Sequence, residues 1–385
     1  MGTKMIIHTV SDGETLKIIA EKYGTSEERL REHNEIEGES LSVGEQLLVL
    51  IPTRTYYPKP RDSAESVMAR FGVCEREFYG NNPGVRDSRL PKDLAIRYTP
   101  HPYGAAATNG YFYKGTSPER FADTLLHLTY VTFASSALCD SGIKELFDTS
   151  EEIKIAKRAG VVPIVKIFDK RSDRSVKKIN IDSIVDHAKK GGYGGISLDL
   201  AYTGNEPSEI AEFLVELRRA MIGNDLILIG EMSGGSEELC DYCDGCVLPI
   251  CEGENLGEFT SRVKEYAERS ESIKTFVEMP VFGKAGEAFI PIKEARDRAR
   301  RGKYRLDSDK SSGFLSYDHK RVGKISFPSL EYIKAALATV NEYGFMGISF
   351  DINGFPGQFL NIYYSLFKTL KSITRTYSEL YNRGS

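Results

Sequence analysis

Five acidic residues stand where predicted β-strands end, and carboxyl groups are side chains that readily support acid–base chemistry. They are Asp169, Asp199, Glu231, Glu252 and Asp351, and Glu206 follows in the loop after Asp199. Two carboxyl groups at a suitable separation can carry out hydrolysis, one as the acid and the other as the base or nucleophile. The alternative is that these acids only cap helices or carry solvated charge in loops.

The elements that must position these acids alternate along the last two thirds of the chain. Short runs rich in β-branched and aromatic residues are separated by longer stretches of helical periodicity. The runs lie at 110–113, 128–134, 161–168, 195–200, 226–230, 245–250, 275–281 and 346–352. Eight such runs predict an α/β fold, a (β/α)8 or TIM barrel over residues 109–385, with its site at the carboxyl ends of the strands.

The connection between the seventh and eighth predicted strands, about 283–328, is too long for a single helix. Within it, residues 314–317 and 324–327 have the composition of two strands joined by a polar turn. We therefore expect a small α+β insertion at this point of the barrel.

The first hundred residues contain a small α+β pattern twice. Residues 5–52 show strand, helix, helix and strand, with Thr15 as the expected cap of the first helix. Residues 56–100 repeat the pattern more weakly at a period of about 48 residues, which is typical of a duplicated domain. We expect domains at 1–53 and 54–100, joined to the barrel by a linker at 101–108.

The first of these units resembles a LysM domain. The matching residues are His8-Thr9-Val10, Gly13 to Leu16, Ile19-Ala20, Tyr23 to Thr25, Asn34, Gly44 to Leu47 and Ile51-Pro52. The resemblance implies binding of glycans that contain N-acetylglucosamine, such as peptidoglycan or chitin. It places the groove between Gly13, Glu14, Thr15 and Leu16 on one side and Ile36, Glu37 and Gly38, as far as Ser40, on the other.

Two positions in these units carry alternatives. Core packing is the other expected role of Leu16. In the second unit, which resembles a divergent LysM domain, Arg61 replaces Gly13, so sugar binding by that copy is an open question.

The barrel segment resembles glycoside hydrolase family 18, most closely its LysM-bearing, spore-cortex-lytic N-acetylglucosaminidases. The resemblance rests on TNGYFY, TYVTFASSAL, IAKRAGVVPIVKI, GFLSYDHKRVGKISF, GISFDINGFPGQF and the segment GGISLDLAYTG at 194–204. That family ends its fourth strand with alternating acids, of which the last is a Glu that protonates the leaving oxygen. Here the three positions are Ser197, Asp199 and Ala201, so the acid is absent. Asp199 matches the residue that orients the substrate's acetamide, or it only hydrogen-bonds neighbouring strands.

Other positions of the same site depart from that family. Its strand-six Tyr and Asp correspond to Cys251 and Glu252, and its floor Trp corresponds to Asp351 in a chain without tryptophan. Tyr111, within TNGYFY, stays an expected sugar contact. General acid catalysis contributes about 10²–10⁴-fold to a rate. We therefore expect a glycan-binding protein whose barrel has lost hydrolase activity.

Two other interpretations stay open. An active N-acetylglucosaminidase could use a relocated acid, for which Glu206, Glu231 and Glu252 are the candidates. Alternatively, the chain could be a scaffold of the spore coat whose barrel mouth binds another coat protein.

Composition excludes several other classes of function. The net charge of −4, with acids and bases interspersed, gives no reason to expect a nucleic-acid partner. No apolar run approaches the length of a membrane span, and the amino terminus has no signal-peptide pattern. Synthesis in the cytoplasm and deposition in the spore coat or cortex are what the resemblance then implies. No phosphate-binding glycine loop or paired histidine motif is present, so no cofactor is expected.

Four cysteines fall within twelve residues: Cys240, Cys243, Cys246 and Cys251. Their spacing is compatible with metal ligands, but alternation along a strand would point Cys246 and Cys251 to opposite faces. We therefore expect small buried side chains here and no metal.

Overall fold

The computed structural model describes most of the chain and divides it into two compact units. The described residues are 5–38, 40–71, 73, 75–82, 84–85, 90–97, 101–125, 127–199, 205–231, 237–251 and 253–370. The first unit consists of residues up to 104, 282–335 and 356–368, and the second of 105–281, 336–355 and the residues from 369. Each unit is therefore assembled from separate stretches of sequence.

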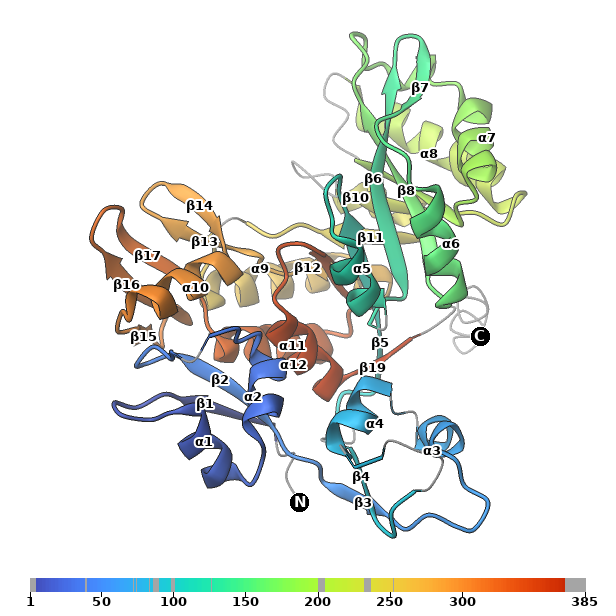
Figure 1. Cartoon of the computed structure of the whole chain (residues 1–385). Helices are drawn as coiled ribbons and strands as arrows, with labels where there is room; N and C mark the ends of the chain where they lie inside the picture. Colours follow the sequence, from blue (N-terminus) through green and yellow to red (C-terminus); the bar gives the residue numbers. More distant parts are fainter. Residues whose placement is uncertain are drawn as a thin grey trace. The chain divides into compact units, whose positions relative to one another are not determined.

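Eight parallel strands in the second unit close into the predicted barrel (Figure 1). They are β5 (Ala105–Phe112), β6 (Tyr130–Cys139), β8 (Val162–Asp169), β9 (Gly195–Asp199), β10 (Ile227–Glu231), β11 (Gly245–Leu248), β12 (Thr275–Glu278) and β18 (Gly347–Asp351). They pair in that order, and β18 returns to β5. The (β/α)8 fold predicted from the sequence is confirmed.

Helices connect the barrel strands, as the alternating pattern predicted. They are α5 (Pro118–Leu125), α6 (Ser150–Arg158), α7 (Ile181–Gly191), α8 (Pro207–Ile222), α9 (Leu256–Arg269), α11 (Leu330–Glu342) and the short 3₁₀ turns η1 (Val176–Lys178), η2 (Glu237–Tyr242) and η3 (Ser272–Lys274). An antiparallel strand, β7 (Gly142–Glu145), folds back on the end of β6.

The predicted linker at 101–108 is wrong at its carboxyl end, because β5 already begins at Ala105. Ala106, Ala107 and Thr108 are buried. The small side chains that are typical of a linker here fill positions in a barrel strand where larger ones would not fit.

The barrel interior changes from apolar to polar toward the carboxyl ends of the strands. One layer is apolar and consists of Ala107, Tyr130, Ile164, Ile229, Val247 and Phe276. Residues two positions further along each strand face the same side. In that next layer stand Asn109, Thr132, Lys166, Ser197, Glu231 and Glu278. The sequence therefore places polar and charged groups where a barrel carries its site.

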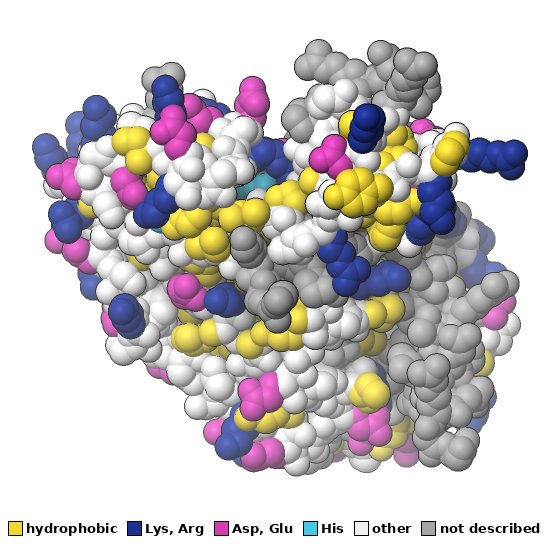
Figure 2. All heavy atoms as spheres, turned by 90° about the horizontal axis from the view of Figure 1, so that it is seen from below, with side chains coloured by type: hydrophobic (Ala, Val, Ile, Leu, Met, Phe, Trp, Pro, Cys, Tyr) yellow, Lys and Arg dark blue, Asp and Glu magenta, His cyan; other side chains and the backbone are white. Residues whose placement is uncertain are grey.

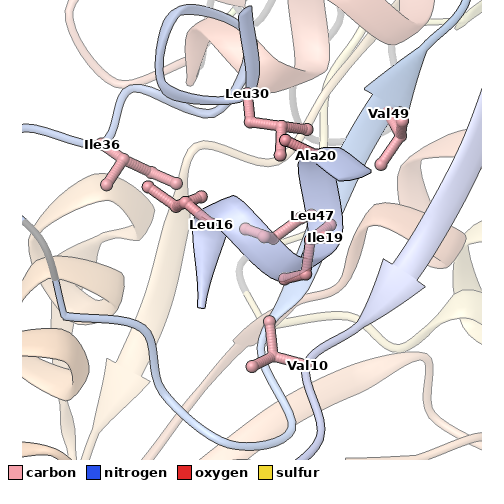
Figure 3. Close-up of a cluster of buried hydrophobic side chains, with 8 residues drawn as sticks. All are labelled: Val10, Leu16, Ile19, Ala20, Leu30, Ile36, Leu47 and Val49. Atoms are coloured by element: carbon pink, nitrogen blue, oxygen red, sulfur yellow. The ribbon is translucent and has the colours of Figure 1, made fainter. Parts of the chain in front are cut away.

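The first unit contains two small strand–helix–helix–strand structures, each with an antiparallel strand pair. The first consists of β1 (Met5–Thr9), α1 (Leu16–Tyr23), α2 (Glu27–Asn34) and β2 (Gln46–Leu50). The second consists of β3 (Arg54–Tyr56), α3 (Ala64–Phe71), α4 (Glu75–Asn81) and β4 (Leu94–Arg97). Each has its own apolar core, and Figure 3 shows that of the first.

The predicted insertion also belongs to the first unit. Its strands form a five-stranded antiparallel sheet, with α10 packed on it. The elements of the insertion are β13 (Phe282–Ala285), β14 (Ala288–Pro291), α10 (Ile292–Gly302), β15 (Asp307–Asp309), β16 (Phe314–His319) and β17 (Gly323–Pro328). Outside the insertion, α12 (Gly357–Leu366) and β19 (Lys368–Thr369) follow β18 near the end of the described chain. The hairpin expected at 314–327 is present as β16 and β17.

Charges of both signs are interspersed over the face shown in Figure 2, in keeping with the small net charge. The described helices include none with the length and hydrophobicity of a membrane span.

Candidate functional site

Lys166 and Glu231 form an ion pair inside the carboxyl end of the barrel. Glu231 ends β10, and its carboxylate contacts Lys166 Nζ on β8. Ser197 Oγ, on the intervening strand β9, donates a hydrogen bond of 2.5 Å to Glu231 Oε1. The two charged side chains are only 14% and 16% exposed. A cation and a hydroxyl thus engage both oxygens of the Glu231 carboxylate.

Aromatic rings flank the Lys166 ammonium group. Its Nζ lies 5.2 Å from the ring centroid of Tyr111 and 5.2 Å from that of Phe168. Burial raises the pKa of Tyr111 well above its ordinary value, and the Glu231 charge raises it further. The Tyr111 hydroxyl therefore stays protonated and can donate a hydrogen bond.

Glu278, the last residue of β12, is a second carboxyl group in this part of the barrel. Its Oε2 accepts a hydrogen bond of 3.1 Å from Ile250 N. Burial raises the pKa of Glu278 most strongly, the Ile250 hydrogen bond lowers it, and the Glu231 charge raises it. A buried carboxyl group with a raised pKa, near a second carboxyl group that is paired with a lysine, is an arrangement that can separate acid and base roles.

Sequence reasoning identified Glu231 but missed Lys166 and Glu278. A signal for both was present in the sequence, because each is a charged residue that directly follows apolar residues in its strand, at the position that faces the barrel interior. A charge placed there must find a partner or become neutral.

Asp199 and Asp351 end their strands in different surroundings. Asp199 is exposed at the end of β9, in register with Glu231 on the neighbouring strand. Asp351 ends β18 and accepts a hydrogen bond of 2.8 Å from Asn353 N. Burial raises the pKa of Asp351. Both residues therefore lie at the carboxyl end of the barrel, as the sequence pattern predicted.

The other predicted acids are engaged in local structure or lie outside the description. Asp169 ends β8 and forms an ion pair of 2.7 Å with Arg171. Glu206 is exposed at the N-cap position of α8, which agrees with the helix-cap alternative. Ala201 and Glu252 lie outside the described residues.

The cysteine cluster is divided by burial. Cys240, Cys243 and Cys246 are buried, and Cys251 is exposed. Burial raises the pKa of the Cys246 thiol, and the neighbouring Cys240 and Cys243 thiols add to this effect. In the part of the chain that the structure describes, no three or more His, Cys, Asp or Glu side chains are arranged to hold a metal ion.

In the first small unit, Glu14 closes the turn between β1 and α1. Its carboxylate accepts a hydrogen bond of 2.8 Å from Ser11 N and lies 2.8 Å from His8 Nε2 and 3.5 Å from Lys22 Nζ. The Ser11 hydrogen bond is the main cause of a lowered Glu14 pKa. Thr15 caps α1 by accepting a hydrogen bond from Ile18 N. Glu14 and Thr15 thus hold the shape of the first predicted groove loop.

The second small unit repeats this turn 48 residues later. Asp62 accepts hydrogen bonds from Lys59 N at 2.8 Å and from the Tyr56 hydroxyl at 2.6 Å, and pairs with Arg70 at 3.0 Å. The Tyr56 hydrogen bond, followed by that from Lys59, lowers the pKa of Asp62 to about 2. Tyr56, Lys59, Asp62 and Arg70 occupy the positions that His8, Ser11, Glu14 and Lys22 hold in the first small unit.

A buried asparagine is repeated at the same spacing. Asn34 donates to the carbonyls of Leu30 and Leu48 and accepts from Leu48 N. Asn82 makes the corresponding three hydrogen bonds with Phe78 and Ala95. The two small strand–helix–helix–strand structures therefore share side-chain geometry as well as topology.

The second predicted groove loop follows α2. Ile36 belongs to the same apolar core as Leu16, and Figure 3 shows both side chains within it. Of the two roles expected for Leu16, glycan contact and core packing, the structure shows core packing. The exposed members of the predicted groove are Gly13, Thr15, Glu37, Gly38 and Ser40.

Residues 8–49 match the family model of the LysM domain. The first small unit is a LysM domain. The match begins within β1 and ends within β2, so it spans nearly the whole strand–helix–helix–strand structure.

A curated protein is similar to this chain in sequence. The Bacillus subtilis (strain 168) protein YdhD, named as a sporulation-specific glycosylase, is 24% identical over 245 residues, which are 58% of this chain and 57% of that protein. The chain thus spans little more than half the length of that relative.

Solved structures establish the fold. The spore cortex-lytic enzyme SleL of Bacillus megaterium QM B1551 matches with a TM-score of 0.73 at 17% identity, over 96% of this chain and 100% of that one. A chitinase of Chromobacterium violaceum ATCC 12472 matches with a TM-score of 0.57 at 14% identity, over 68% of this chain and 98% of that one. The chain therefore combines a LysM domain with a glycosidase-like barrel.

Proposed function

We propose that this protein binds a cell-wall glycan containing N-acetylglucosamine through its first LysM domain, and that its barrel does not hydrolyse that glycan. The observation that carries the proposal is a LysM match beside a glycosidase-like barrel whose acid position is Ala201. Alanine has no proton to give, so the leaving oxygen would depart without general acid catalysis.

The charged groups of the barrel support the same conclusion. Ser197 stands at the first acidic position of the motif, and it donates a hydrogen bond to Glu231. Glu231 in turn is paired with Lys166. Because a cation and a hydroxyl engage both its oxygens, Glu231 is a poor replacement for the missing acid.

A spore is the proposed place of action, with the cortex peptidoglycan as the glycan. This follows from the names of the relatives, a sporulation-specific glycosylase and a spore cortex-lytic enzyme. The second small unit, a divergent LysM-like copy, is proposed to support the first structurally, and spore-coat proteins are proposed as further partners.

Glu278 favours a second candidate function, hydrolysis of the same glycan by a relocated acid. It was not among the acids predicted from the sequence, yet burial keeps its carboxyl group protonated more readily than an ordinary Glu. Release of fragments that stops in a Glu278→Gln variant would support this function in place of the first.

Binding is tested by sedimentation of the full chain with insoluble peptidoglycan and with chitin. Gly38→Arg fills the open space over the predicted groove loop without backbone strain, and it is expected to abolish sedimentation. Gly84→Arg is the matched control, because Gly84 also faces open space but lies in the second small strand–helix–helix–strand structure. Equal binding by wild type and Gly38→Arg would contradict the proposed groove.

A further inference from the structure

Helix α10 of the insertion packs against the loop that follows α2 of the LysM domain. Arg300 Nε donates to Glu45 at 2.8 Å, and its other nitrogens donate to the carbonyls of Asn34 and Glu35 at 3.3 and 3.2 Å. Arg296, one turn earlier, pairs with the Glu35 carboxylate at 3.1 Å. Both arginines are buried. Their donors thus reach backbone and side chains at the start of the groove loop.

A backbone contact joins the segment after α10 to the last part of the loop that follows α2. Leu306 N donates to the carbonyl of Val43 at 2.7 Å. At Gly44 the chains are so close that a Cβ atom would lie 1.9 Å from the Leu306 carbonyl oxygen. The groove loop is therefore held between two fixed points, and α10 is part of its surroundings.

A pocket of about 370 Å³ lies between the loop and the helix. Its lining comes in equal parts from the two elements: Glu37, Gly38 and Ser40 from the loop, and Asp297, Arg300 and Arg301 from α10. The volume falls within the range of small-ligand pockets. Three of these residues belong to the loop that the LysM resemblance assigns to the glycan, so a bound glycan would meet α10.

Among the described residues that line this pocket, every charged side chain but one has an ion-pair partner. Arg300 bonds to Glu45 and lies 3.4 Å from Asp297. Glu37 lies 3.7 Å from Lys293. Arg301 is exposed and has no ion-pair partner among the described residues. Arg301 is thus the positive charge that the pocket offers to a ligand.

We propose that α10 extends the glycan site of the LysM domain and that Arg301 binds a carboxylate of the glycan. A guanidinium group recognises a carboxylate through two parallel hydrogen bonds. Peptidoglycan carries carboxylates on its acidic sugar and on its stem peptide, whereas chitin is neutral. The pocket therefore selects peptidoglycan over chitin, an inference that rests on the proposed glycan-binding function.

Calorimetric titration of the full chain with soluble ligands tests this selection. The ligands are peptidoglycan fragments with a stem peptide, fragments without one, and neutral N-acetylglucosamine oligomers of matched length. Arg301→Ala is expected to weaken binding of the carboxylate-bearing fragments by roughly tenfold, the effect of losing one charge-assisted contact. It should leave binding of the neutral oligomers unchanged. A loss confined to fragments with the peptide would identify the peptide carboxylate as the ligand.

Arg305→Ala is the control, since Arg305 is exposed but does not line the pocket. Arg301→Lys should restore part of the affinity, because it keeps the charge but not the planar fork. Unchanged binding by Arg301→Ala, or an equal loss for charged and neutral ligands, would overturn the role of Arg301 while leaving the proposed function intact. If wild type binds none of the three ligands, the proposed function itself fails.

Discussion

Glu278 is a carboxyl group whose folded surroundings favour the proton, and its effect on stability has a definite sign. Its raised pKa means that the folded chain binds more protons than the unfolded chain between the ordinary value of 4.5 and the raised value. Stability is therefore lost as the pH rises through this interval. The Glu278→Gln variant lacks this titrating group and does not lose that stability. Its unfolding free energy relative to that of the wild type should therefore increase from pH 4.5 to pH 8. Urea unfolding at both pH values measures this, and a constant difference would be evidence against a raised pKa.

Lys166 and Glu231 should depend on each other for stability. Lys166→Met leaves the Glu231 carboxylate buried without its cation, which should cost roughly 2–3 kcal/mol of unfolding free energy. Adding Glu231→Gln removes that charge and should recover most of the loss. Denaturant unfolding of the two single variants and the double variant gives the coupling directly. Additive losses would show that the pair is not coupled.

The sequence could predict where these side chains stand but not how they interact. The strand pattern placed Glu231, Asp199 and Asp351 at the carboxyl ends of strands, and the structure has them there. The ion pair with Lys166 depends on which strands become neighbours and how they align, which spacing along one chain does not contain. The raised pKa of Glu278 depends on burial by the same arrangement.

Gly44 joins the LysM domain to the insertion at the level of the elements. It has a φ of +84°, and an added Cβ would meet the Leu306 carbonyl. Gly44→Ala should therefore lower stability by more than about 1 kcal/mol, since both strain and a clash oppose it. Gly13→Ala is the matched control, because Gly13 has a φ of +77° but open space around it. Thermal unfolding of both variants checks this, and equal losses would show that the contact with Leu306 adds nothing.

Element boundaries were predictable where hydrophobic periodicity was strong. The two strand–helix–helix–strand units and their 48-residue spacing followed from apolar spacing, and the structure repeats even the turn carboxylates Glu14 and Asp62. The linker at 101–108 failed, because small residues are typical both of linkers and of tightly packed strands. The contact of α10 with Glu35 and Glu45 joins segments more than 250 residues apart, and no local pattern predicts it.

Across the whole molecule, the two units have different relations to the proposed function. The first unit holds the LysM domain and the pocket beside α10, which offer exposed groups to a glycan. The second holds a barrel with the fold of the spore cortex-lytic enzyme SleL, and the proposal takes Ala201 as the position of the missing acid. The proposed function therefore assigns recognition of the glycan to the first unit and assigns no hydrolysis to the second.

Digestion of spore-cortex peptidoglycan by the full chain tests this account most directly. The protein is sedimented with the insoluble material, and the supernatant is searched for released muropeptides by mass spectrometry. An Ala201→Glu variant, which restores the acid at its family position, is treated in parallel. We predict that the wild-type chain sediments with the peptidoglycan and releases no fragment above the protein-free control. Wild-type release of fragments with new sugar ends, abolished by Glu278→Gln, would contradict the loss of hydrolysis.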